Sequence, residues 1–281
     1  MKMPETEREP ADFVRGLRRG RKASMLAAWP GVGQVSLIAA RYLVEQLKAE
    51  PIGELEAYHF FDPTGVAVKN NVVQAPQFPE NTFYYWENPD NPKGDLLIFI
   101  GDAQPQGKMY ELAHCILDIA VKFKIKRIYT FAAALVRMHY TEPSRVWGVC
   151  TENKLLKEFT GKDIVLRGEL QIAGMNGLLL GVGKERKFEG FCLLGEVPLY
   201  ATRIPNPKAA LAVLKGYLSV IGVSVDMTEM TENARQAEEE MKKLAVQAMG
   251  EFIDNFTKPI WPPGPEGEED EEEGEEGEGE G

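Results

Sequence analysis

Short apolar runs rich in β-branched or aromatic residues alternate with helix-length amphipathic segments along most of this sequence. The alternation restricts the fold strongly, because it is typical of a mostly parallel sheet covered by helices. The expected strands are Ser24–Trp29, Asp95–Ile100, Lys126–Ala133, Arg145–Cys150 and Gly190–Leu194, the last of them late and central. The expected helices are Gln34–Lys48, Gly107–Phe123 and Pro207–Ile221, with shorter ones near Glu152–Phe159 and Asn176–Lys184. We therefore predict an α/β fold with a mostly parallel mixed sheet.

Two more runs have strand character, Asn71–Ala75 and Thr82–Glu87, and the turn-like PQFPEN separates them. This spacing predicts that the two runs pair with each other, in antiparallel orientation. No long linker interrupts the pattern between residues 24 and 225, so we expect one α/β core domain over residues 23–227. Residues 1–22 are then an N-terminal arm.

The segment Thr228–Phe256 predicts a long amphipathic C-terminal helix, within residues 228–257. Small and apolar residues recur along it at alternating spacings of four and three, which is the seam of a helix packed on a helix. The seam consists of Met230, Ala234, Ala237, Met241, Leu244, Ala248 and Phe252. Two interpretations stay open: the helix packs on its own domain, or it forms an oligomer or partner surface.

The net charge of −11 comes from the C-terminal end of the sequence. Residues 266–281 hold eleven acidic residues and no basic one, and removing these eleven from the 43 acids leaves 32 acids against 32 bases. Such a run repels itself and buries no apolar area, so we predict a disordered acidic tail over residues 258–281. A polyanion would compete with phosphates for any basic patch, which argues against nucleic-acid binding.

Cysteine use and hydropathy place the chain in the cytoplasm. Cys115, Cys150 and Cys192 lie far apart in apolar segments, which favours buried thiols over disulfides or a zinc site. No run reaches the roughly 20 apolar residues of a membrane span, and the first 22 residues lack the apolar stretch of a signal peptide. We expect no membrane association.

The turn after the first strand holds the first candidate site, formed by Pro30, Gly31, Val32, Gly33 and Gln34. With Ser36 in the third position, the turn approaches the dinucleotide-binding pattern GxGxxG, and Glu56 follows about 20 residues later as a candidate ribose ligand. The glycines alternatively let the helix start tightly against the strand. In either case the helix start would suit an anion.

A second candidate site gathers polar residues that follow predicted strands: Asp62, Asp102, Gln104, Arg137, His139, Glu142 and Glu152. Ligands of open α/β sheets bind at the carboxyl ends of the strands, and Asp102 and Gln104 are our candidates there. These residues assemble no nucleophile, base and orienting group, and no group has metal-ligand spacing. We therefore predict no catalytic residue, no metal and no cofactor.

Several blocks, in this order, resemble signatures of the proteasome assembly chaperone 2 family, in the form found in archaea and bacteria. The blocks are Ala27–Gly33, Gly101–Pro105, Met175–Gly181, Gly195–Tyr200, Asn206–Ala210 and Val225–Met227. The resemblance covers about residues 24–256. It implies a three-layer α/β/α sandwich similar to phosphorylase or peptidyl-hydrolase folds, without an established catalytic site and with frequent self-association.

The resemblance also implies a partner, because archaeal and eukaryotic members help proteasome α-subunits to assemble. The leading hypothesis is a non-catalytic, self-associating protein that binds other protein chains, among them α-type subunits. The alternative is an enzyme or small-molecule binder that holds a nucleotide or phosphorylated metabolite between the Gly31–Gly33 turn and the sheet edge.

Overall fold

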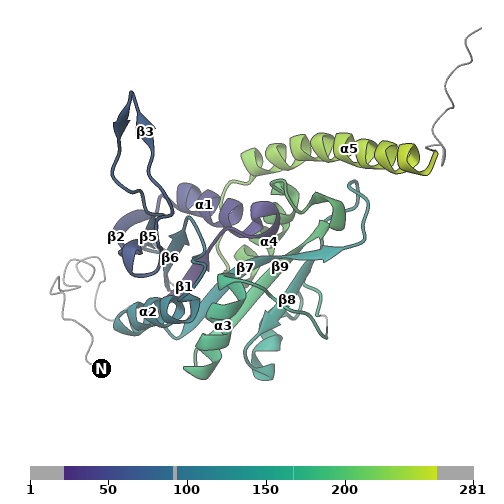
Figure 1. Cartoon of the computed structure of the whole chain (residues 1–281). Helices are drawn as coiled ribbons and strands as arrows, with labels where there is room; N and C mark the ends of the chain where they lie inside the picture. The colour runs from purple at the N-terminus through teal and green to yellow at the C-terminus, as the bar shows by residue number, and fades with distance from the viewer. Residues whose placement is uncertain (1–21, 91–93, 167, 258–281) are drawn as a thin grey trace, which may run out of the picture.

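A seven-stranded mixed sheet forms the centre of the structure (Figure 1). The computed structural model describes residues 22–90, 94–166 and 168–257. The sheet strands are β1 (Ala23–Ala28), β2 (Glu50–Glu54), β5 (Asn81–Trp86), β6 (Asp95–Gly101), β7 (Arg127–Val136), β8 (Val146–Cys150) and β9 (Glu189–Pro198). Their order is β2-β5-β6-β1-β7-β9-β8. The four neighbours β6, β1, β7 and β9 are parallel, whereas β5 and β8 run antiparallel to the strands beside them.

Helices cover both faces of the sheet and give the molecule three layers. The helices α1 (Val35–Leu47) and α4 (Pro207–Ile221) pack on one face, and α2 (Met109–Lys122) and α3 (Met175–Glu185) pack on the other. Side chains of β1 alternate between the two cores: Leu26 and Ala28 face α1, while Met25 and Ala27 face α2. The predicted three-layer α/β/α sandwich with a mostly parallel mixed sheet is confirmed.

The predicted pairing of Asn71–Ala75 with Thr82–Glu87 is wrong. Instead, β4 (Val72–Val73) pairs with β3 (Val68–Lys69) in a separate two-stranded hairpin. The two turn residues Asn70 and Asn71 have φ angles of 51° and 61°, as a tight hairpin turn with matching twist requires. The hairpin projects from the body of the molecule (Figure 1).

The strand that pairs with β5 on its outer side was missed from the sequence. This strand, β2, has the sequence EPIGE, in which proline, glycine and two glutamates hide any strand pattern. The register of the pair shifts between Pro51 and Gly53. A proline and an irregularity are tolerated there because β2 is an edge strand.

Other expected elements differ in length or type. The strands β7 and β9 extend to Val136 and Pro198, several residues beyond their predicted ends, and pair with each other along their full lengths. The segment near Glu152–Phe159 forms a 3₁₀ helix, η3 (Asn153–Phe159), rather than an α-helix. The strand β9 lies in the interior of the sheet, second from the β8 edge.

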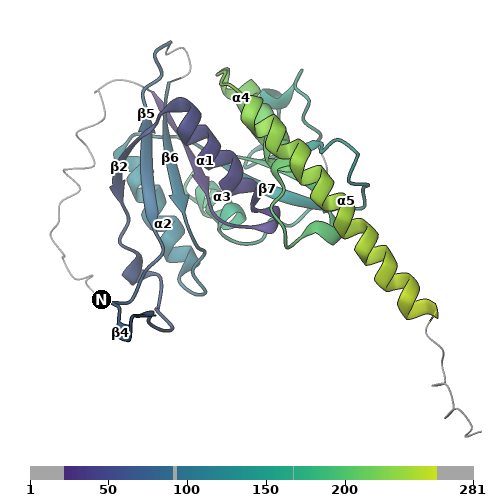
Figure 2. The ribbon, with the colours of Figure 1, turned by 90° about the horizontal axis from the view of Figure 1, so that it is seen from above.

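A helix of 30 residues, α5 (Thr228–Thr257), follows the α/β body. The Asp226 carboxylate accepts hydrogen bonds from the Thr228 backbone N–H and hydroxyl, at 2.8 and 2.7 Å, and so caps the helix start. The first half of α5 packs on α4, and the second half extends beyond the sheet and its covering helices (Figures 1 and 2). The predicted arm up to residue 21 and the acidic tail over 258–281 lie outside the described residues.

Within the described part of the chain, no helix combines the length and hydropathy that crossing a bilayer would require.

Candidate functional site

The loop after β1 is built into the framework of the fold. It passes through Pro30 and Gly31 into the short 3₁₀ helix η1 (Val32–Gln34), where Gly33 has a φ of 61°. The backbone N–H of Asn206, the N-cap of α4, donates to the Gly33 carbonyl at 2.7 Å. A Cβ at Gly33 would lie 3.0 Å from the Asn206 Cβ. Gly33 therefore meets both a conformational and a packing requirement of this contact between α1 and α4.

A buried asparagine at the start of α3 clamps the same loop. Asn176 is 3% exposed, and its side-chain oxygen accepts from the Trp29 backbone N–H at 3.1 Å. Its side-chain N–H donates to the Trp29 carbonyl at 3.2 Å, and the Ser36 hydroxyl donates to its oxygen at 3.3 Å. One side chain thus satisfies both backbone groups of Trp29, the residue that follows β1, and links β1, α1 and α3. No chemical pattern in the sequence singled out Asn176, although it lies in one of the family-like blocks.

Gln104 joins a third segment to this loop. Its side-chain N–H donates to the Pro30 carbonyl, and its oxygen accepts from the Met175 backbone N–H at 2.8 Å. The glutamine packs so closely that a Cβ at Gly174, which has a φ of 74°, would lie 2.4 Å from the Gln104 oxygen. The polar groups of Gln104 are therefore used to position the loops after β1 and β6 against α3.

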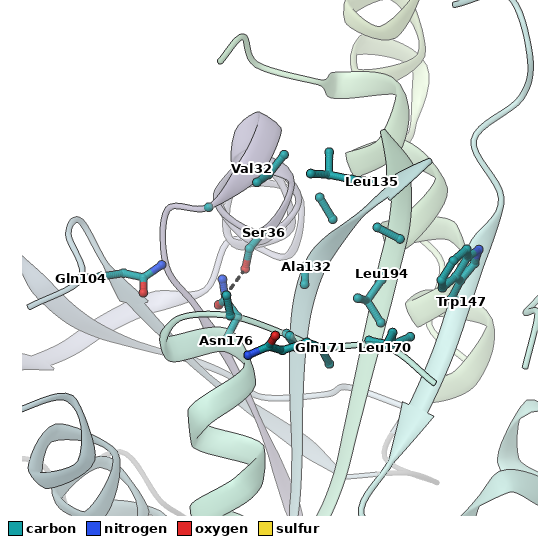
Figure 3. Close-up of a pocket in the computed structure, with 15 residues that line it drawn as sticks. Val32, Ser36, Gln104, Ala132, Leu135, Trp147, Leu170, Gln171, Asn176 and Leu194 are labelled. Carbon is teal, nitrogen blue, oxygen red and sulfur yellow. Dashed lines mark hydrogen bonds between the residues drawn. The ribbon is translucent and has the colours of Figure 1, made fainter. Parts of the chain in front are cut away.

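A cavity of about 340 Å³ opens beside this junction, at the carboxyl ends of β7 and β9. Figure 3 shows Val32 and Leu135 near the top of the view, with Leu194 and Trp147 farther to the right. The lining residues are Gly31, Val32, Ser36, Gln104, Ala132, Ala133, Ala134, Leu135, Trp147, Leu170, Gln171, Ile172, Ala173, Asn176 and Leu194. All of these residues are uncharged, so the lining offers no side-chain cation to a phosphate.

A buried carboxylate supports the far wall of the cavity, and the sequence analysis missed it. Glu196 on β9 is 3% exposed, and it accepts a hydrogen bond from the Trp147 indole N–H at 2.8 Å. The Arg145 guanidinium also donates to it at 3.0 Å, while remaining 56% exposed itself. The carboxylate is buried but paired, and it fixes the Trp147 ring that lines the cavity.

The structure brings together some of the predicted site residues and separates others. Gly31, Val32 and Gln104 line the cavity, and Pro30, Gly33 and Gln34 complete the loop behind it. Asp102 instead forms a surface ion pair with Arg41 at 2.7 Å.

The arrangement does not match a dinucleotide-binding site. That site needs the ribose-binding acid at the end of a strand beside β1. Here β2, which precedes Glu56, is separated from β1 by β5 and β6. Ser36, which takes the position of the third glycine in the GxGxxG pattern, donates a hydrogen bond from its hydroxyl to the Asn176 side-chain oxygen.

The remaining polar candidates do not converge on the cavity. Glu152 follows β8, which runs antiparallel to β9, and therefore lies at the opposite edge of the sheet. The expectation that it joins the others is wrong for that reason. The loop after β7 closes on itself: the Glu142 carboxylate accepts from the His139 backbone N–H at 2.9 Å, and the His139 ring bonds to the Thr141 hydroxyl at 2.7 Å.

The structure describes the side chains of the first four residues of the predicted seam of α5. Met230, Ala234, Ala237 and Met241 are 1–9% exposed, buried against the α/β body. The Lys208 ammonium on α4 donates to Glu238 on α5 at 2.8 Å and fastens the two helices beside the seam. Farther along α5, the apolar side chains of Val246, Met249 and Ile253 are 65%, 67% and 52% exposed. For the side chains of Leu244, Ala248 and Phe252 the structure gives no description.

Comparison with known proteins gives consistent results. A model of the PAC2 family matches residues 25–245. An uncharacterised protein of the archaeon Methanocaldococcus jannaschii is 30% identical over 226 residues, which cover 79% of this chain and 83% of that protein.

Two crystal structures from Pyrococcus furiosus share the fold. PbaB, described as an archaeal proteasome activator, is 32% identical with a TM-score of 0.70, and the match covers 82% of this chain and 96% of PbaB. PbaA, described as an archaeal homologue of a proteasome-assembly chaperone, is 24% identical with a TM-score of 0.62, covering 82% of this chain and 95% of PbaA.

Proposed function

Because this chain belongs to the PAC2 family, we propose that it is a non-catalytic, self-associating protein that binds other protein chains in the cytoplasm, with proteasome α-type subunits among them. The observation that carries the proposal is the 32% identity with PbaB, an archaeal proteasome activator, over 96% of that chain. The assembly chaperone homologue PbaA has the same fold and supports the same class of function.

The polar side chains around the Gly31–Gly33 loop are already hydrogen-bonded within the protein, which supports a structural role for that loop rather than ligand binding. Asn176 and Gln104 each use both ends of their side-chain amides to hold backbone groups in place. The uncharged lining of the neighbouring cavity also fits poorly with a nucleotide or phosphorylated metabolite, because phosphates are bound by cations and by aligned backbone amides.

Exposed apolar side chains on two projecting elements support binding to other chains. Val246 and Met249 on α5 are each about two-thirds exposed, and Val68 and Val73 on the β3–β4 hairpin are 64% and 65% exposed. Apolar surface that remains exposed at the tip of a hairpin and along a helix overhang is a common feature of protein interaction sites.

We assign self-association to the second half of α5. In this assignment Met230, Ala234, Ala237 and Met241 anchor the helix to its own domain. The predicted surface residues Leu244, Ala248 and Phe252 then meet a second copy of the chain along the seam. Val246, Met249 and Ile253 offer a second apolar strip on the other side of the helix. On this proposal each interpretation of the seam from the sequence applies to one half of the helix.

Light scattering after size-exclusion chromatography tests this assignment. The full-length chain should elute as an oligomer, and the double substitution Val246→Glu with Met249→Glu should shift it to a monomer, because charges would enter an apolar interface. The matched control places the same two charges on the exposed polar face of the first half, as Asn233→Glu with Gln236→Glu, and should leave the oligomer intact. A monomeric wild-type chain, or an oligomer that survives both changes, would refute self-association through α5.

Affinity purification of the tagged full-length chain from its source cells tests the partner. The proposal predicts α-type proteasome subunits in stoichiometric amounts, and recovery of the chain without them would count against the proposed partner.

A further inference from the structure

One side of β7 has no strand partner over its second half. The strand pairs with β9 along all ten residues, from Arg127 to Val136. On its other side, the register with β1 ends at the pair Ala27–Thr130. Within residues 22–90, 94–166 and 168–257, no strand takes the place of β1 beyond that point.

The hydrogen-bond pattern shows which backbone groups face this open side. The Glu189 N–H donates to the Lys126 carbonyl at 2.9 Å, which sets the even-numbered residues of β7 toward β9. Backbone groups alternate from side to side along a strand, so the N–H and carbonyl groups of Ala133 and Leu135 point the other way. They form a row of donors and acceptors at the spacing of a sheet ladder.

The open side of β7 faces the cavity. Ala133 and Leu135 of β7 line it, together with Gly31 and Val32 from the loop after β1. Asn176 also lines the cavity, and it bonds both backbone groups of Trp29, the residue that follows β1 (Figure 3). The result is a slot that is lined by a strand edge and a glycine and has no charged side chain in its lining.

We infer that this slot accepts an extended peptide segment of a partner protein, which adds to the sheet as a strand beside Ala133 and Leu135. Strand addition takes its affinity from backbone hydrogen bonds and its specificity from pockets for alternate side chains. The small side chains of Ala132 and Ala134 and the uncharged lining select an uncharged segment with small or medium apolar side chains. The inference rests on the proposed protein-binding function and adds a site for it, separate from α5.

Two substitutions block the slot without requiring a change of fold. Gly31 has an extended backbone with a φ of −161°, and a Cβ there would meet no atom closer than 3.7 Å, so Gly31→Phe fills the cavity. Ala133→Pro removes a donor that faces away from β9 and is therefore outside the β7–β9 ladder. The control Gly181→Phe adds the same aromatic ring on the exposed side of α3, where a Cβ would meet nothing within 4 Å.

The test uses octapeptides selected by phage display from a random library against the full-length chain. Fluorescence anisotropy then measures the affinity of a selected peptide for the wild type and the three variants. We expect Gly31→Phe and Ala133→Pro each to weaken binding at least tenfold and Gly181→Phe to leave it unchanged. We also expect slower amide exchange at Leu135 when the peptide is bound. Equal urea unfolding midpoints establish that the variants are folded.

Three outcomes would overturn the inference. One is a failure to select any peptide, and the second is a selected peptide that binds both slot variants as tightly as the wild type. The third is a ligand excluded by Gly31→Phe but not by Ala133→Pro, since it would occupy the cavity without using the strand edge. If α-type subunits still co-purify with the wild-type chain in any of these cases, the proposed function stands and only its site is wrong.

Discussion

At the scale of single residues, amide side chains buried between loops determine the geometry of the candidate site. Asn176 forms hydrogen bonds with both the N–H and the carbonyl of Trp29. Gln104 forms one hydrogen bond with the Pro30 carbonyl and one with the Met175 backbone N–H. These residues replace strand pairing at the point where β1 leaves the sheet. They satisfy backbone polar groups beside the cavity that would otherwise be buried without a partner.

The clamp makes Asn176 important for stability. Substitution by alanine would leave the buried N–H and carbonyl of Trp29 without their partners, at about 1–3 kcal/mol for each unsatisfied group. We predict that Asn176→Ala lowers the free energy of unfolding by about 2–6 kcal/mol in urea titrations. The control Asn153→Ala, at an exposed position, should change it by less than about 0.5 kcal/mol. Equal effects of the two substitutions would show that the clamp contributes nothing.

The three cysteines should differ in reactivity. Cys192 is fully buried in β9, and desolvation raises the pKa of its thiol to about 12. Cys115 and Cys150 are only half-buried, which departs from the sequence-based expectation that all three are buried. In native buffer at pH 8, iodoacetamide should modify Cys115 and Cys150 while Cys192 stays unmodified, because the thiolate is the reactive form. Peptide mass spectrometry measures this, and early modification of Cys192 would contradict the burial of β9.

At the scale of elements, α5 combines a docked half and a half that extends beyond the body. Met241 is the last described seam residue in the core and is 2% exposed, and the second half of the helix runs beyond the sheet and its covering helices (Figures 1 and 2). The same helix therefore contains side chains that stabilise the monomer and side chains that remain available to other chains.

A pair of methionine substitutions tests this division. Met230 is 1% exposed in the seam, and Met249 is 67% exposed. We predict that Met230→Ala lowers the free energy of unfolding by about 2–5 kcal/mol, since it removes buried methylenes and leaves a cavity. Met249→Ala should change it by less than about 0.5 kcal/mol under conditions where the chain is monomeric. Urea unfolding followed by circular dichroism measures both changes. A larger loss of stability for Met249→Ala than for Met230→Ala would contradict the docking of the first half of α5.

Acid should weaken the start of α5. Hydrogen bonds from the Thr228 hydroxyl and backbone lower the pKa of Asp226, and hydrogen bonds from Arg235 and Gln236 lower the pKa of Glu232 to about 2. A lowered carboxyl pKa favours the ionised form in the fold. Its stabilising effect is therefore present above the unfolded pKa of about 4 and is lost as the pH falls toward about 2.

We predict that the melting temperature falls less steeply between pH 5 and pH 2 in Asp226→Asn with Glu232→Gln than in the wild type. Both carboxylates are exposed to solvent, so the difference should shrink in high salt. Parallel pH profiles at low salt would exclude a contribution from these two carboxylates.

The elements also show how far the sequence could predict the structure. Apolar runs such as Asp95–Gly101 are buried along their whole length, so pattern and structure agree there. The edge strand Glu50–Glu54 has no such pattern, because an edge strand needs little apolar burial and tolerates proline. The predicted pairing of Asn71–Ala75 with Thr82–Glu87 does not form, because Asn70 and Asn71 both adopt left-handed backbone angles. Two such residues form a tight turn, which pairs β4 with β3 instead.

At the scale of the whole molecule, only part of the candidate site could be predicted from the sequence. Gly31, Val32 and Gln104 follow strands that a local pattern identifies, and all three line the cavity. Asn176 and Glu196 are far from them in the chain, and their importance arises only when α3 packs against the loop after β1 and β9 pairs with β8. Local patterns do not encode such long-range packing.

We propose three surfaces of the described residues for contact with other chains: the second half of α5, the β3–β4 hairpin and the open side of β7. They lie on different elements, so each can be blocked without the others. This separation lets self-association, peptide binding and partner binding be measured independently.

Direct binding of the purified full-length chain to purified proteasome α-type subunits of the same source tests the central claim. In biolayer interferometry at physiological salt, the account predicts saturable binding that denatured subunits do not reproduce. The absence of binding up to about 0.1 mM, with both proteins folded, would contradict it, because that limit excludes any interaction stronger than about −5.5 kcal/mol.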